Sequence, residues 1–354
     1  MTTTIGVEEE FFLIDPVSRA VKSLGPQVVA HAVASMGELV TGEFNLCQLE
    51  VKTPPCADAA QLCDELCQLR AAAAKAAMAQ GVRLCASGTP VVACDGPVLV
   101  GDHPRYRAGV AQYRAMLDDF AICSLHTHVY LPDAEVAVLV GNHLRPWLPL
   151  LVAMSANSPF YQSKDTGYAS WRAVTRSRFP CLGPPPFAAS LREHREIACA
   201  IAEAEAMLDV DTPFWDVRPN PRLPTIEIRA MDVTTDVDDT VALAVLLRAM
   251  VATATQRVIA GDPGPQPCSE VLRATYWQAA RDGWSPRAAE QARRLIDCVM
   301  PALQQHGDVD LVTAFLRRLE HHGTGAHRQR ASAARHGELT GVVDDLIAAT
   351  AGHT

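Results

Sequence analysis

Residues 4–15 read TIGVEEEFFLID, and this stretch decides how the rest of the chain is interpreted. Its β-branched and aromatic residues predict a strand near the N-terminus, yet three consecutive carboxylates, Glu8, Glu9 and Glu10, lie within it. Because side chains alternate between the two faces of a strand, Glu8 and Glu10 project together and Glu9 projects the other way. The stretch therefore predicts a sheet with one acidic face.

Three more predicted strands, FNLCQLEVKT, ICSLHTHVYL and PTIEIRAMD, alternate in the same way between a polar face and an apolar face. Their chemically notable polar positions are Glu50, then His126 and His128, then Glu227 with Arg229. Carboxylates and imidazoles are the ligands of hard and borderline cations. A solvated sheet face, whose acids pair with Lys and Arg, is the alternative interpretation.

Electrostatics and the choice of residues favour a divalent metal. Carboxylates a few ångströms apart repel by roughly 4 kcal/mol per pair at an effective dielectric constant near 20, so several together need a counter-charge. Glutamates outnumber histidines and no cysteine has zinc-like spacing, which favours Mg²⁺ or Mn²⁺ over structural zinc. The H-x-H pair would be weak evidence by itself.

Arg229 adds a permanent cation next to Glu227, where a phosphoryl group bound to metals would lie. A simple cross-strand ion pair is the alternative. The sequence has neither a G-x-x-x-x-G-K-[ST] nor a G-x-G-x-x-G motif, so any nucleotide must be held by the sheet, its metals and arginines.

The order of predicted elements indicates an α+β fold with a mostly antiparallel sheet and a helical C-terminal part. Predicted helices cover 57–80, 134–156, 188–208, 237–260, 270–281, 286–306 and 308–321. Predicted strands cover 4–14, 42–52, 82–87, 121–131 and 224–232. The polar and aromatic stretch 157–187 is expected to be a loop over the site, and a surface excursion whose arginines face water is the alternative.

Composition limits the class of protein. The 354 residues carry a net charge of −9, which argues against nucleic acid or an anionic membrane as a partner. The eleven cysteines form no C-x-x-C pair, and only MTTT precedes the first predicted strand, so we expect a cytoplasmic protein with no membrane span.

The sequence resembles the bacterial carboxylate-amine ligases of the glutamate–cysteine ligase type 2 family, relatives of glutamine synthetase. The resemblance runs from residue 6 to residue 330. Its matching stretches are GVEEEFFLID, QLEVKTPP, HTHVYLPD, NHLRPWLPLLVAMSANSPFYQSKDTGYASWR, GPPPF, WDVRPNPRLPTIEIRAMD and GTGAHRQR. The resemblance implies one glutamine-synthetase-like catalytic domain over 1–354, helical from about 237 onward. In such a domain a curved sheet holds ATP, Mg²⁺ or Mn²⁺ and an amino acid on its concave face, with helices packed outside.

The resemblance also implies roles for individual residues. Metal ligands would be Glu8, Glu10, Glu50, His126 and Glu227, the last also catalytic. Catalytic Arg229 would contact the transferred phosphoryl group, with Arg176 and His128 near the nucleotide phosphates. Tyr168, Arg172 and Asn157 would bind the substrate. Glu9 has no assigned role.

The implied reaction converts a carboxylate, expected to be the γ-carboxylate of glutamate, into an acyl phosphate and joins it to an amine such as cysteine. A homodimer is compatible with the resemblance. Two departures from the family pattern are Tyr130, where Gly is usual and a narrower pocket is expected, and His327, where Asp is usual. A guanidino-kinase-like phosphotransferase, a metal-dependent hydrolase and a nucleotide-binding protein without catalysis are the alternatives.

Overall fold

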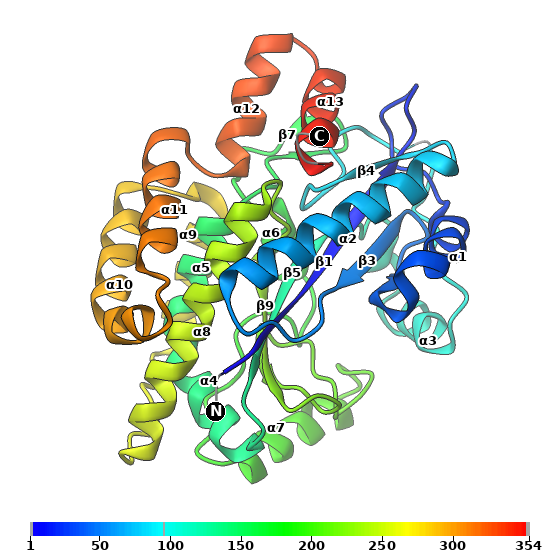
Figure 1. Cartoon of the computed structure of the whole chain (residues 1–354). Coiled ribbons are helices and arrows are strands. Elements are labelled where there is room, and N and C mark those ends of the chain that lie inside the picture. Colours follow the sequence, from blue (N-terminus) through cyan, green and yellow to red (C-terminus); the bar gives the residue numbers. More distant parts are fainter. Residues whose placement is uncertain (1–2, 95, 352–354) are drawn as a thin grey trace.

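The computed structural model describes residues 3–94 and 96–351, and an antiparallel sheet lies at its centre (Figure 1). The order of strands is β2-β3-β1-β5-β9-β8, and β4 pairs with the C-terminal end of β1. The strands are β1 (Ile5–Ile14), β2 (Val40–Gly42), β3 (Gln48–Lys52), β4 (Arg83–Cys85), β5 (Ser124–Tyr130), β8 (Val217–Pro219) and β9 (Thr225–Asp232). A separate two-stranded sheet contains β6 (Phe160–Tyr161) and β7 (Lys164–Asp165).

Helices account for most of the remaining described residues. Those before β8 are α1 (Gly25–Met36), α2 (Ala59–Ala79), α3 (Pro104–Tyr113), α4 (Ala134–Leu144), α5 (Leu148–Ser155), α6 (Trp171–Arg176) and α7 (Leu191–Glu203). Those after β9 are α8 (Val237–Ile259), α9 (Ser269–Asp282), α10 (Pro286–His306), α11 (Val309–His322), α12 (Gly325–His336) and α13 (Leu339–Thr350). Three short 3₁₀ helices cover Gly37–Leu39, Arg114–Leu117 and Arg145–Trp147.

The apolar face of the sheet is buried under helices. Ile5 and Val7 of β1 pack in one core with α2, α4, α5 and α8, and Figure 1 shows α2 lying across the central strands. Phe11 and Leu49 belong to a second core with α1, α2 and α13. Burial of one face fixes the register, because a slip of one residue would turn every side chain to the wrong face.

That register brings the predicted polar positions together. Glu8 lies opposite His126 on β5, and Glu10 lies opposite Glu50 on β3. His128 lies opposite Glu227 on β9. Four strands that are distant in sequence therefore present their polar side chains to one region.

The predicted α+β class, the mostly antiparallel sheet and the helical C-terminal part are confirmed. Two predicted elements are interrupted. The predicted helix 134–156 divides into α4, a 3₁₀ turn and α5, since Pro146 and Pro149 cannot continue an α-helical ladder. The predicted strand 42–52 divides into β2 and β3 around a non-strand stretch at 43–47. The division of the chain into one domain stays a prediction.

One described helical stretch, Ala134–Ser155, is long and apolar enough to cross a membrane. However, 78% of its most apolar window is buried inside the protein, as is typical of a core helix.

Candidate active site

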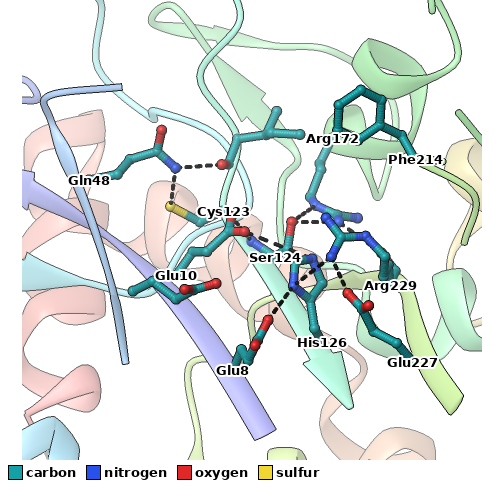
Figure 2. Close-up of polar contacts among 12 residues, drawn as sticks. Glu8, Glu10, Gln48, Cys123, Ser124, His126, Arg172, Phe214, Glu227 and Arg229 are labelled. Carbon is teal, nitrogen blue, oxygen red and sulfur yellow. Dashed lines mark hydrogen bonds and ion pairs between the residues drawn. The ribbon is translucent and has the colours of Figure 1, made fainter. Parts of the chain in front are cut away.

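A cavity of about 780 Å³ opens on the polar face of the sheet. Its walls include Glu8, Glu10, Glu50, Glu227 and Arg229, which come from β1, β3 and β9. His126 of β5 also lines the cavity, and Figure 2 shows it between Glu8 and Arg229. We call this the acidic cavity. The side chains that strand alternation grouped, except His128, thus line one cavity.

Three groups of side chains in and beside the acidic cavity could each surround a cation, because their ligand atoms lie within 4.8 Å of one another. The groups are Glu8 with Glu50 and His126, Glu8 with His128 and Glu227, and Glu10 with Glu43 and Glu50. Glu8 and Glu50 each belong to two groups, so the three form a continuous patch of carboxylate oxygens.

His126 is held in a form that suits metal binding. Its Nδ1 lies 3.2 Å from Glu8 Oε2, while its Nε2 is buried and has no hydrogen-bond partner among the described residues. In the tautomer whose Nδ1–H donates to Glu8, the lone pair of Nε2 is unused. A carboxylate that orients an imidazole through its other nitrogen is a common arrangement in metal sites.

The carboxylates do not ionise equally. Burial opposes ionisation of Glu8, but hydrogen bonds with His126 and His128 outweigh it and hold the pKa of Glu8 well below its usual range. Burial, followed by repulsion from Glu8 and Glu43, raises the pKa of Glu50 well above its usual range. Burial and the charge of Glu10 raise the pKa of Glu43 to about 7. Burial and mutual repulsion thus oppose ionisation of Glu43 and Glu50, even though Lys52 Nζ lies 2.8 Å from Glu50 Oε2.

Glu227 is enclosed by donors. Arg218 approaches it with Nε 3.0 Å from Oε2 and Nη2 3.2 Å from Oε1, and Asn220 Nδ2 donates to Oε2 at 2.9 Å. Arg229 also donates to Glu227 through Nη1. Burial opposes ionisation of Glu227, but Arg229 and Arg218 outweigh it and lower its pKa. The Glu227–Arg229 pair is thus fixed at the wall of the acidic cavity.

These donors fit a divalent cation that prefers oxygen ligands. Five glutamates with two imidazoles and no thiolate match Mg²⁺ or Mn²⁺ better than zinc. A cation bound here would use the unpartnered Nε2 of His126 and would offset the repulsion among the carboxylates.

Two residues at this site were not anticipated from the sequence. In a continuous strand Glu43 would lie on the opposite face from Glu50. The chain leaves the strand conformation at 43–47, however, and the side chain of Glu43 joins the ligand group of Glu10 and Glu50. Arg218 lies on β8, which is only three residues long and gives little alternation to detect. Its position opposite Glu227 in the β8–β9 register is the structural reason for their pairing.

Arg172 is fully buried and, through Ser124, contacts the part of the cavity wall that holds Glu10. Its Nη2 donates to Ser124 Oγ at 2.7 Å (Figure 2). Its Nη1 donates to the carbonyl of Ala230. The backbone N–H of Ser124 in turn donates to Glu10 Oε2 at 2.8 Å. In this conformation Arg172 orders the wall that carries Glu10, and its predicted contact with substrate stays a prediction.

The other predicted substrate residues also lie outside the acidic cavity. Asn157 is buried, donates to the carbonyls of Ala86 and Val233, and accepts from Gln329 at 2.8 Å. The hydroxyl of Tyr168 accepts a hydrogen bond from Trp277 at 3.1 Å. Their roles in substrate binding stay predictions.

Of the residues predicted near phosphates, Arg176 lines the acidic cavity and is paired with Asp216 at 2.5 Å. His128 Nε2 lies 3.4 Å from Glu8 Oε1, and its Nδ1 lies 3.0 Å from Thr225 Oγ1. His128 therefore lies beside the carboxylate patch, while Arg176 lines another part of the same cavity.

The two departures from the family pattern have local explanations. The expectation that Tyr130 narrows the pocket is wrong, because this side chain lies at the solvent-exposed end of β5, is 36% exposed and does not line the acidic cavity. His327 caps the N-terminus of α12, where its Nδ1 accepts from the backbone N–H of Thr324 at 3.3 Å.

A family model and the similar sequences point to the same protein family. The family described as Glutamate-cysteine ligase family 2 (GCS2) matches residues 4–348. A protein of Mycobacterium sp. (strain KMS) named "Putative glutamate--cysteine ligase 2-2" is 40% identical over 360 residues, which cover 98% of each chain. A protein of Nocardia farcinica named "Putative glutamate--cysteine ligase 2-1" is 39% identical over 98% of this chain and 93% of its own.

Two solved structures share the fold at low sequence identity. The glutamate–cysteine ligase of Francisella tularensis in complex with AMP superposes with a TM-score of 0.70 and 13% identity, over 99% of this chain and 88% of that one. A bifunctional glutathione synthetase from Pasteurella multocida also has a TM-score of 0.70 and 13% identity, over 99% of this chain and 51% of that one.

Proposed function

Because this chain belongs to glutamate–cysteine ligase family 2, we propose that it is an ATP-dependent ligase that joins a carboxylic acid to an amine. The acid is expected to be glutamate, activated at its γ-carboxylate, or a similar acid, and the amine is expected to be cysteine or a related compound. The observation that carries the proposal is the convergence of four glutamates and His126 beside the Glu227–Arg229 pair in one cavity.

The reaction proceeds in two steps. An oxygen of the substrate carboxylate attacks the γ-phosphorus of ATP, the bond to the bridging oxygen breaks, and ADP leaves. The amine nitrogen then attacks the carbonyl carbon of the acyl phosphate, inorganic phosphate leaves, and the nitrogen loses a proton. The first step is needed because a free carboxylate is a poor acylating agent in water.

The acidic cavity supplies the charges that this chemistry needs. Glu8, Glu10, Glu50, His126 and Glu227 would hold Mg²⁺ or Mn²⁺, with Glu43 as an additional ligand. Such metals, when bound, neutralise phosphate charge and align the phosphoryl group. Arg229 contacts the transferred phosphoryl group, while Arg218 keeps Glu227 ionised and in place.

Segment 157–187 contributes a wall that would help to exclude water. Phe179 and Leu182 line the acidic cavity, and Arg176 places a cation there. Exclusion of water matters because water competes with the amine for the acyl phosphate.

The test is product analysis with purified protein, ATP, Mg²⁺, glutamate and a panel of amines. We expect amine-dependent release of phosphate, an amide detected by mass spectrometry, and loss of both in Glu227→Gln. Glu203→Gln, on the exposed surface of α7, is the matched control. A phosphorylated product without an amide would instead identify a guanidino-kinase-like enzyme, and turnover without ATP would identify a hydrolase. Identical behaviour of Glu227→Gln and wild type would overturn the assignment of the site.

A further inference from the structure

A second cavity, of about 860 Å³, lies against the acidic cavity. It is bounded by α6, α7, α9 and the loop after α6, and we call it the arginine cavity. Arg176, Phe179 and Leu182 line both cavities, so these side chains form a common wall. Its volume is within the range of about 300–1,000 Å³ that is common for small-molecule sites.

Arg145 is a buried cation in the wall of the arginine cavity. This side chain is 2% exposed, and its Nε donates to the carbonyl of Pro185 at 2.7 Å. Its Nη1 is buried without a hydrogen-bond partner among the described residues, and no described carboxylate lies within 4 Å of it. Burial lowers the pKa of the guanidinium.

Neighbouring polar groups are already paired with one another. Arg176 contacts Asp216 at 2.5 Å, and the hydroxyl of Tyr276 donates to the other oxygen of Asp216 at 2.9 Å. Arg178 contacts Asp119 at 2.9 Å. Arg145 is therefore the buried cation of this cavity that lacks a counter-charge within the described residues.

An unpaired buried charge is costly, and an anion that enters the cavity would remove that cost. The walls limit what kind of anion fits. The apolar part of the cavity wall includes Pro185, Pro186, Ile197, Trp215 and Leu272. A planar carboxylate matches the fork of an arginine, and an apolar body matches these walls.

We propose that the arginine cavity is a binding site for a small monocarboxylate with an apolar or aromatic body, held by Arg145. This site is separate from the metal-binding carboxylates, and the inference does not rest on the ligase activity. The two sites share a structural connection, since the backbone carbonyl of Asp216 accepts from the N–H of Arg229 at 2.8 Å.

Binding of sodium benzoate, followed by calorimetry and ligand-observed NMR, tests the proposal. Benzamide is the matched neutral probe. Because a charge-assisted, bidentate contact would be lost, we expect benzamide to bind at least about tenfold more weakly, and Arg145→Gln to weaken benzoate by a similar factor. Arg273→Gln, which removes an exposed arginine of the same cavity, should change the affinity by less than about threefold.

Two further variants keep the test decisive. Ala274→Trp fills the cavity from an exposed position on α9 and should abolish benzoate binding even if Arg145→Gln does not fold. Arg229→Gln, in the acidic cavity, should leave benzoate affinity unchanged. Each of four outcomes would overturn the proposal. These are binding of benzamide as tight as that of benzoate, unchanged benzoate affinity in Arg145→Gln, unchanged benzoate affinity in Ala274→Trp, and loss of benzoate binding in Arg229→Gln. Failure of the ligase assay would not bear on any of these outcomes.

Discussion

Glutamates on the two faces of β1 have opposite electrostatic environments. Glu9, on the helix-covered face, is fully buried and meets Arg70 at 2.8 and 2.5 Å, with the hydroxyl of Thr240 donating at 2.7 Å. Glu8 and Glu10, on the other face, join further carboxylates in the acidic cavity. One face contains a charge that the fold itself neutralises, while the other gathers charges that the fold leaves for a cation.

This difference indicates which carboxylates serve the fold and which serve the chemistry. Loss of a compensated buried charge removes stability, because its partner is left unpaired. Loss of a carboxylate that its neighbours repel, such as Glu43 or Glu50, costs the fold less but removes a cation ligand. The predictions below separate these two kinds of effect.

The largest effect is expected for Glu8→Gln. Glu8 belongs to two of the three ligand groups, so its loss should lower kcat for ATP-dependent amide formation by about 10³-fold or more. Because His126 and His128 hold the pKa of Glu8 below its usual range, the ionised side chain stabilises the fold, so we expect the variant's melting temperature to fall, but by less than that of Glu9→Gln. Steady-state kinetics and a thermal unfolding curve, measured on the same preparation, check both expectations. Activity within tenfold of wild type would contradict the assignment of Glu8.

Glu9→Gln should show the reverse pattern. Arg70 would lose its buried counter-charge, so we expect a loss of about 3–5 kcal/mol in the free energy of unfolding. Activity per folded molecule should remain within about threefold of the wild type. Urea unfolding followed by assay at a temperature where the variant is folded checks this. Restored stability in the double variant Glu9→Gln/Arg70→Met would confirm that the unpaired arginine causes the loss.

Arg218→Gln should have an intermediate effect. Glu227 would keep Arg229 and Asn220 as partners but lose its two-point contact with Arg218. Outer groups that orient a metal ligand are worth about 10–100-fold, so the apparent affinity for Mg²⁺ should weaken by a similar factor. Activity measured against Mg²⁺ concentration tests this, and Arg222→Gln, which changes an exposed arginine of the same cavity, is the control. An unchanged Mg²⁺ dependence would contradict the role of Arg218.

The smallest effect is expected for Glu43→Gln without metal. Burial and the charge of Glu10 make ionisation of Glu43 unfavourable, so removal of its charge should relieve repulsion. The melting temperature in metal-free buffer near pH 8 should be equal to or roughly a few degrees above that of the wild type. A marked fall in melting temperature would show that Glu43 has a structural partner instead.

Local alternation explains why much of the site could be predicted from the sequence. Glu8, Glu10, Glu50, His126 and Glu227 lie on strands whose opposite faces are apolar, and their side-chain directions follow from position alone. Antiparallel pairing then brings those faces together.

The remaining features depend on contacts that alternation cannot detect. Glu9 and Arg70 are 61 positions apart, and Glu43 joins the site only because the predicted strand is interrupted. Arg172 and Asn157 come from a long irregular segment, where spacing gives no side-chain direction. Likewise, the proline-induced break between α4 and α5 places Arg145 beside the second cavity, which no helical periodicity indicates.

We infer that Glu8 and Glu10 bind a metal, whereas Glu9 stabilises the fold. Electron paramagnetic resonance of Mn²⁺ binding to the metal-free protein, without substrates, tests this central claim most directly. We expect the wild type and Glu9→Gln to bind Mn²⁺ with affinities within about threefold of each other, and Glu8→Gln to bind at least about tenfold more weakly. Equal weakening in Glu8→Gln and Glu9→Gln, with both variants folded, would contradict the account.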